Sequence, residues 1–295
     1  MKSPRWLEPL LSLPSFGWLV VFFAVPTLLV FVLSFKPTDL TGGVGAGWTL
    51  DTWRSLANPS YPVIIWRTVW LSALATALCL GFGIPVAYWI ARLDERWRNR
   101  VLLLIILPFW TNFLIRIFAW RTLLHPDGYV KSIAVWLGWA EPNTQLLYND
   151  WAILLVLVYT HLPFAILPLY AAAEKFDFTL LDAARDLGAG RWRAFRSVFL
   201  PGIRVGLITA FLIVFIPALG SYAIPAIVGG PTSEMIGNKI AQRATTDRNL
   251  PHAAALGAVL SVVIFVPLVA AAALRRRHSN GNAAGPAPAI PGGHP

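Results

Sequence analysis

The sequence predicts an all-α integral membrane protein with six transmembrane helices and both termini in the cytoplasm. Of its 295 residues, 57% are hydrophobic and only 13% are charged, whereas about a quarter are charged in an ordinary soluble protein. The remaining charges gather in short basic segments that separate long charge-free runs. This composition excludes a disordered, collagen-like or coiled-coil chain.

Charge-free runs locate the spans, because a charge at a helix centre costs about 2.5–3.5 kcal/mol on insertion scales. Each run reaches the roughly 20 residues that cross the hydrocarbon core as a helix. The third is interrupted late by Arg116 and Arg121, so its end is expected near an interface or along a polar path. The expected spans are 14–35, 68–91, 101–124, 151–173, 205–228 and 252–274.

The first run is expected to stay in the protein, because no small-residue cleavage site follows Phe35. The spans then form one transmembrane domain, 9–274, after a cytoplasmic N-terminus, 1–8. Fifteen of the 24 basic residues fall on one side: the N-terminus, the second-to-third and fourth-to-fifth connections, and the tail. Lys and Arg bias sets topology, so both termini are predicted to be cytoplasmic. The tail, 275–295, is predicted to be disordered.

Three features limit the kinds of site and ligand that the chain can have. The single cysteine, Cys79, excludes a disulfide framework and a cysteine-based metal site. The net charge of +10 is explained by basic loops rather than by nucleic-acid binding. His161 has no ligand at metal-binding spacing on its predicted helix, so we interpret it as a hydrogen-bonded packing residue and predict no metal site.

The most informative segment is the basic connection at 174–204. Thr179 and Asp182 have the spacing of a capping box that starts a helix, and Gly188 permits a sharp turn. A second amphipathic stretch places Trp192 and Phe195 on one face and basic residues, Arg191 among them, on the other. Such an element fits a partner's groove, with aromatic anchors. It equally fits an amphipathic connector on anionic headgroups.

This segment resembles the EAA loop in permease subunits of binding-protein-dependent ABC importers, which reads Glu-Ala-Ala, three residues, Gly and a later Leu-Pro. The matching residues are Asp182, Ala183, Ala184, Gly188, Leu200 and Pro201. Aspartate replaces the first glutamate and keeps its carboxylate. The resemblance implies a coupling helix that docks on a separate ATPase. Asp182 and Gly188 would set its shape, Trp192 and Phe195 would anchor it, and Arg191 would meet acidic groups.

Further segments, 107–120, 215–220, 224–230 and 235–238, resemble the first permease subunit of spermidine/putrescine importers. The likeness extends from about residue 67 to residue 274. Ser221 stands where an acidic residue is expected after Gly220, and this removes a negative charge from the pathway. A polyamine is therefore the expected cargo, and an opine, an amino-acid derivative or an organophosphonate stays open.

The resemblance also implies an assembly. The chain would adopt the type I permease fold of ABC importers in the bacterial inner membrane and enclose a pathway with a homologous second permease. Two cytosolic ATPase subunits would hold the Mg-ATP, and a periplasmic or lipid-anchored binding protein would deliver the solute. The chain itself has no Gly-x-x-x-x-Gly-Lys-Ser/Thr sequence. We therefore expect a transport subunit that binds no cofactor, not an enzyme.

Residues in the third and fifth spans are candidates for the translocation pathway. Proline and glycine break the fifth span, and broken helices are tolerated where they line a cavity or a protein interface. An arginine inside a membrane marks a functional site by default, although it can also snorkel to headgroups. A structural kink and ordinary packing are the alternatives for the rest. The candidates are Trp110, Asn112, Arg116, Ser221, Tyr222 and Pro225.

Two other classes of protein fit the sequence less well. An ion-coupled secondary transporter would need carboxylates inside its spans, and the span cores contain none. An intramembrane serine protease would need Ser221 as the nucleophile and His161 or His252 as the base. No Gly-x-Ser-x-Gly motif supports the protease.

Overall fold

The computed structural model describes residues 7–39 and 42–282, and the regular elements within these ranges are all helical. An isolated antiparallel bridge between Thr38 and Val44 closes the loop that follows the first helical run. The all-α prediction therefore holds throughout the described part of the chain.

Three continuous helical runs are long and apolar enough to cross a membrane. The first joins α1 (Leu7–Leu19), the π-helical turn η1 (Val20–Ala24) and α2 (Val25–Leu33). The others are α4 (Ser60–Ala91) and α8 (Asp150–Glu174). They correspond to the first, second and fourth predicted spans.

Two further candidates are pairs of helices joined at a sharp bend, each of which is a broken span or a re-entrant loop. The third predicted span begins as α5 (Glu95–Ile106) and the 3-10 turn η2 (Leu107–Trp110), then turns by 89° into α6 (Phe113–Leu123). The run from α10 (Arg191–Ala194) through η3 (Phe195–Phe199) and α11 (Leu200–Gly202) turns by 72° into α12 (Arg204–Leu219). Counting each bent pair once gives up to five candidate spans among the described residues.

The sixth predicted span lies in α15 (Leu250–Asn282), whose described apolar stretch is Leu250–Val266. The tail was predicted to be disordered from residue 275, whereas α15 continues through the arginines to Asn282. Alanine, leucine and arginine are strong helix formers, and they extend the helix beyond the apolar run. The rest of the predicted tail, 283–295, lies outside the described residues, as do residues 1–6 of the predicted cytoplasmic N-terminus.

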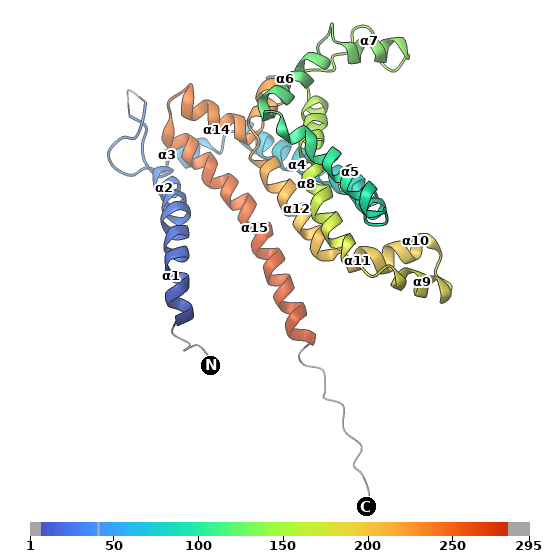
Figure 1. Ribbon diagram of the computed structural model, residues 1–295. Coiled ribbons are helices and arrows are strands. Elements are labelled where there is room, and N and C mark those ends of the chain that lie inside the picture. The colour runs from blue at the N-terminus through green and yellow to red at the C-terminus, as the bar shows by residue number, and fades with distance from the viewer. Residues whose placement is uncertain (1–6, 40–41, 283–295) are drawn as a thin grey trace, which may run out of the picture.

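The core of the molecule is the packing of α4, α8 and α12 (Figure 1). Small residues bring α4 and α8 close together: a Cβ on Gly83 would lie 3.1 Å from Leu169 and 3.6 Å from Ala165. The Cys79 thiol, fully buried, donates to the Val158 carbonyl at 3.6 Å. The buried hydroxyls of Thr68 and Thr76 donate to carbonyls one turn earlier in α4, at 2.8 Å and 2.7 Å, whereas the buried Ser72 hydroxyl has no partner among the described residues.

The short helices lie at the two ends of this core. Figure 1 shows α6 and α7 (Tyr129–Trp136) at one end and α9 (Thr179–Asp186), α10 and α11 at the other. The run α1–α2 and helix α15 stand beside the core and contact each other. The remaining helices are α3 (Asp51–Ser55), α13 (Ala223–Val228) and α14 (Ile236–Thr245).

Candidate functional site

The first candidate site is the α9–α11 element, residues 175–203, which joins α8 to α12. Its first helix is not started by the predicted capping box. The Asp177 carboxylate accepts from the Thr179 amide at 3.0 Å and from its hydroxyl at 2.7 Å. Asp182 instead forms an ion pair with Arg185 at 3.1 Å. The prediction was wrong because an aspartate two residues before the helix reaches the first free amide in a tighter turn.

Charge makes this cap stronger. The hydrogen bonds from the Thr179 hydroxyl and amide lower the pKa of the Asp177 carboxyl, since both favour its ionised form. The negative charge also lies beside the N-terminus of α9, where a helix dipole favours it.

Gly188 reverses the chain between α9 and α10, as the sequence predicts. Its φ of +87° lies in the left-handed region that glycine adopts most easily. The turn closes with the Ala189 amide donating to the Ala184 carbonyl at 3.0 Å and the Gly188 amide donating to Arg185 at 2.9 Å. Helix α9 therefore ends in a hydrogen-bonded left-handed cap.

An aromatic cluster ties the element to the membrane domain. Phe199 is fully buried, and its ring centroid lies 5.0 Å from Tyr88 of α4 and 5.2 Å from Phe176. Phe195 lies 5.5 Å from Tyr88 in an edge-to-face contact, and Phe178 completes the cluster. Aromatic pairs in such arrangements add about 0.5–1.5 kcal/mol each to their area burial. The element is thus held firmly on its own chain.

The two aromatic residues predicted on one face of α10 do lie together, because the Trp192 and Phe195 rings stack with their centroids 5.6 Å apart. Phe195 turns inward to the cluster, and Ala184 packs against the same core. Trp192 keeps 68% of its surface exposed and Leu187 keeps 90%. Asp182, Ala183 and Arg191 are exposed beside them. Phe195 and Ala184 thus pack on the core, whereas Trp192, which stacks on Phe195, and Leu187 present apolar surface to the outside.

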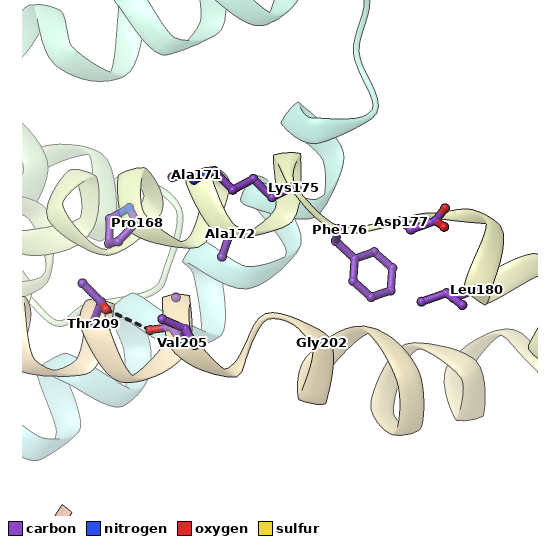
Figure 2. A pocket seen from close by; sticks show the side chains of 11 residues that line it. Pro168, Ala171, Ala172, Lys175, Phe176, Asp177, Leu180, Gly202, Val205 and Thr209 are labelled. Carbon is purple, nitrogen blue, oxygen red and sulfur yellow. Dashed lines mark hydrogen bonds between the residues drawn. The ribbon is translucent and has the colours of Figure 1, made fainter. Parts of the chain in front are cut away.

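A groove between α8 and α12 lies directly behind this element (Figure 2), with a volume of about 610 Å³. Its walls approach so closely that a Cβ on Gly206 would clash with Ala172, and one on Gly202 would clash with Phe176. In Figure 2 the Phe176 ring lies between Gly202 and Leu180, where α8 passes into α9. The element therefore makes close contacts with both the α8 side and the α12 side of the groove.

Polar contacts hold the same end of α8. Glu174 forms an ion pair with Arg98 of α5 at 3.3 Å and accepts from the Tyr170 hydroxyl at 2.7 Å. Arg92 lies over the rings of Tyr88 and Phe178, 5.5 Å and 5.7 Å from their centroids. These contacts connect α4, α5 and α8 to the base of the element.

The second candidate site is a cavity of about 440 Å³ at the break in the fifth span. Helix α12 ends at Leu219, and the chain resumes as α13 after an irregular turn at 220–222. The cavity brings together residues from α5–α6, α8 and this break. Its lining is Phe109, Phe113, Arg116, Thr160, His161, Phe164, Pro217, Gly220, Ser221, Tyr222, Ala223 and Ile224.

Three of the predicted pathway residues, Arg116, Ser221 and Tyr222, thus line one cavity. The other three do not. Trp110 is 77% exposed at the end of η2, and the Asn112 side chain caps α6 by accepting from the Leu114 amide at 2.8 Å. Pro225 is buried within α13.

The sequence analysis did not predict that Thr160, His161 and Phe164 of α8 form one wall of this cavity. His161 donates from Nδ1 to the Leu157 carbonyl at 2.8 Å, which agrees with its interpretation as a hydrogen-bonded packing residue. Its spacing with Phe164 on one helical face was the available signal. Among the described residues, no group of three or more histidine, cysteine or acidic side chains is placed to hold a metal ion.

Arg116 dominates the electrostatics of the cavity. Its guanidinium carbon lies 4.9 Å from the Phe109 ring centroid and 6.0 Å from that of Phe113. Its Nε is buried and has no hydrogen-bond partner in the described part of the chain. The lining contains no carboxylate. The cavity therefore carries one positive charge without a counter-charge.

Comparison with known families identifies the chain. The model of the family described as binding-protein-dependent transport system inner membrane component matches residues 80–279. The chain belongs to this family. It is an inner-membrane permease subunit of an ABC importer, as its EAA-like loop predicted.

Individual relatives of this permease cover almost its whole length. The spermidine/putrescine transport system permease protein PotB of Salmonella typhimurium strain SL1344 is 34% identical over 91% of this chain and 94% of its own. PotB of Escherichia coli K12 is 35% identical over 86% and 92%, and that of Haemophilus influenzae is 36% identical over 84% and 87%.

Solved structures show the same fold. A bacterial ABC transporter involved in import of the acidic polysaccharide alginate matches with a TM-score of 0.69, 20% identity and coverage of 92% of this chain and 96% of its own. The same kind of transporter in complex with an alginate pentasaccharide-bound periplasmic protein gives a TM-score of 0.68 and 20% identity, with 92% and 94% covered. The permease thus has the helical fold of ABC transporter membrane subunits.

Proposed function

We propose that this permease subunit imports a small organic cation of the polyamine class, driven by ATP hydrolysis on separate subunits. The observation that carries the proposal is the 34–36% identity to spermidine/putrescine permeases over most of the chain. The proposed assembly contains a second permease, two cytosolic ATPase subunits that bind Mg-ATP, and a periplasmic or lipid-anchored binding protein. The six spans would place both termini in the cytoplasm.

The α9–α11 element is the proposed site of coupling to the ATPase. Its outward patch of Leu187, Trp192 and Ala183 would enter a groove on the ATPase, and Arg191 would meet acidic groups at the rim. Asp182 helps hold α9 through Arg185, and Gly188 sets the turn. Closure of the ATPase subunits would then move α8 and α12 through the tight contacts at Gly202 and Gly206.

The cavity at the break in the fifth span is the proposed part of the translocation pathway. Its aromatic walls suit an alkyl amine, since ring faces attract ammonium groups by about 0.5–2 kcal/mol. Ser221 and the uncompensated Arg116 favour a second cargo class, an opine, amino-acid derivative or organophosphonate, because each of these carries an anionic group.

Affinity purification of the tagged chain from its native membrane, followed by mass spectrometry, tests the assembly. We expect recovery of a second permease and an ATPase with a phosphate-binding Gly-rich motif. Vesicles that contain the recovered complex and its binding protein should then accumulate labelled putrescine or spermidine with ATP. A chain that purifies alone and shows no ATP-dependent uptake contradicts the proposal.

A further inference from the structure

Arg116 is the formally charged residue of the cavity at the fifth-span break, and the described part of its own chain leaves it without an anion. Its guanidinium lies over Phe109, but its Nε is buried and makes no hydrogen bond. An aromatic ring replaces only part of the hydration that a buried guanidinium loses. An arginine inside a membrane therefore needs a polar partner, and the described residues of this chain provide none for the Arg116 Nε.

Arg121, five residues later on the same helix, shows the contrast. Its guanidinium donates to the Tyr148 hydroxyl at 3.4 Å, and its residue is exposed at the outer part of α6. It lies by a different hollow, outside the cavity that holds Arg116. The two arginines therefore have different requirements, and only Arg116 lacks a polar partner.

A second copy of this chain would not supply the missing anion. The cores of its spans contain no aspartate or glutamate. Three acidic residues at described helix ends near the core are paired within the chain. These pairs are Asp150 with Arg67 at 3.6 Å, Glu174 with Arg98 at 3.3 Å, and Glu234 with Lys239 at 3.1 Å.

The surroundings of Arg116 indicate a protein surface as the missing partner. Phe113 and Phe164 are each 40% exposed around the cavity, and Tyr222 is 58% exposed. Aromatic side chains around one arginine are typical of the centre of a protein interface. Acyl chains would leave the guanidinium without a partner, so lipid does not fit this surface.

We propose that Arg116 forms an ion pair with an intramembrane carboxylate of a companion permease whose sequence differs from this chain. The inference rests on the proposed function, because it takes the companion from that assembly. The guanidinium offers two parallel N–H donors, which match a carboxylate in bidentate geometry. The pair makes the two permeases obligate partners, since each subunit alone would keep an uncompensated charge in the membrane.

The test uses the complete importer, purified through a tag on this chain. Arg116→Met should weaken retention of the companion permease at least about tenfold, because the carboxylate opposite loses its ion pair. Arg121→Met, the matched control, should change retention by less than about twofold. Equal retention in the two variants overturns the proposal.

A double-mutant cycle identifies the carboxylate. Each aspartate or glutamate in the companion's spans is changed to its amide, in the wild-type and the Arg116→Met backgrounds. For the partner acid, the double variant should lose no more retention than either single variant. Arg116→Glu combined with that acid changed to arginine should restore retention to within about threefold of wild type.

Other results of these experiments would contradict the ion pair or the proposed function. Additive losses at every carboxylate, or a companion without any intramembrane acid, overturn the ion pair while the importer assignment stands. A third outcome also overturns the ion pair. In it, Arg116→Met leaves the assembly intact and lowers the uptake of carboxylated solutes, such as ornithine, but not of the matching diamine, putrescine. Failure of the wild-type chain to retain any second permease or ATPase overturns the proposed function itself.

Discussion

Gly188 shows how one residue shapes the α9–α11 element. Its positive φ is required for the reversal between α9 and α10, and no atom lies within 4 Å of the position where a Cβ would be added. The demand on this residue is therefore purely conformational. Gly190, two residues later, has an ordinary φ of −62° and equally open surroundings.

This contrast gives a matched pair of variants. Gly188→Ala should cost about 1–2 kcal/mol in the local stability of the turn, because an L-residue resists the left-handed region. Gly190→Ala should cost much less. The expected result is slower ATP-driven uptake by Gly188→Ala at equal amounts in the membrane, measured in vesicles. Equal uptake by both variants would contradict a role for the turn in coupling.

The cap at Asp177 predicts a pH dependence. Its pKa is lowered in the folded protein, so the stability it gives α9 is fully present above the ordinary carboxyl pKa. That stability is lost as the pH falls through the lowered folded pKa. Hydrogen exchange of residues 179–186, corrected for intrinsic rates, should rise in that acid range.

Asp177→Asn provides the control for this prediction. Asparagine keeps a side-chain acceptor for the Thr179 amide but has no charge to lose. Its exchange should therefore be nearly independent of acid pH. A variant that keeps the wild-type pH profile would assign the effect to another carboxyl group.

Among the elements, the paired helices α8 and α12 depend on the absence of a side chain at Gly206. A Cβ there would clash with Ala172 and would approach the Pro168 carbonyl at 2.9 Å. Gly81, also within a transmembrane helix, has nothing within 4 Å of the same added atom. The two glycines therefore separate a packing effect from a general effect of glycine in helices.

Gly206→Ala should lower stability by about 1–3 kcal/mol, since overpacking forces the helices apart. Gly81→Ala should be neutral or stabilising by up to about 1 kcal/mol, because alanine favours a helix. Thermal unfolding of the purified permease in detergent measures both. A neutral Gly206→Ala would show that the contact at the groove in Figure 2 yields easily.

The elements also show where sequence reasoning succeeds. Charge-free runs found the helices, because the membrane penalises isolated charge strongly. The same rule placed the start of the second span at residue 68, whereas α4 begins at Ser60. Arg67 is tolerated inside the helix because it pairs with Asp150 at 3.6 Å and donates to the Glu234 carbonyl at 3.4 Å. Such long-range partners are invisible in a local pattern.

In the candidate sites too, local features were predicted from the sequence and tertiary contacts were not. Local features, such as the turn at Gly188 and the break after Leu219, were predicted correctly because glycine and proline act on neighbouring residues. The cavity wall formed by Thr160, His161 and Phe164 was missed, since it meets Arg116 only through tertiary packing. The stacking of Trp192 on Phe195 agrees with the predicted aromatic face, but the contact of Phe195 with Tyr88 was missed because Tyr88 lies far away in the sequence, on α4.

At the scale of the whole molecule, the basic loops and the exposed tips predict the orientation. Leu187 on the α9–α11 element is 90% exposed, and Trp139, beyond α7, is 82% exposed. Figure 1 shows these elements at opposite ends of the core. The charge bias predicts that the Leu187 end faces the cytoplasm.

Cysteine labelling tests that orientation. In a Cys79→Ala background, Trp139→Cys should react with an impermeant maleimide on intact spheroplasts, because it faces outward. Leu187→Cys should react only after permeabilisation. The reverse pattern would invert the topology, and labelling of both from outside would indicate leaky membranes, which an internal cytosolic marker detects.

The outward patch of Leu187 and Trp192 has a further consequence for the cell. In the proposed assembly, a permease made before its ATPase would display these apolar side chains to water, on an element that its aromatic cluster keeps folded. Exposed apolar patches on folded proteins invite chaperones, proteases and aggregation. A permease subunit without a bound ATPase should therefore be degraded faster, and its lifetime in the membrane should increase with the amount of ATPase in the cell.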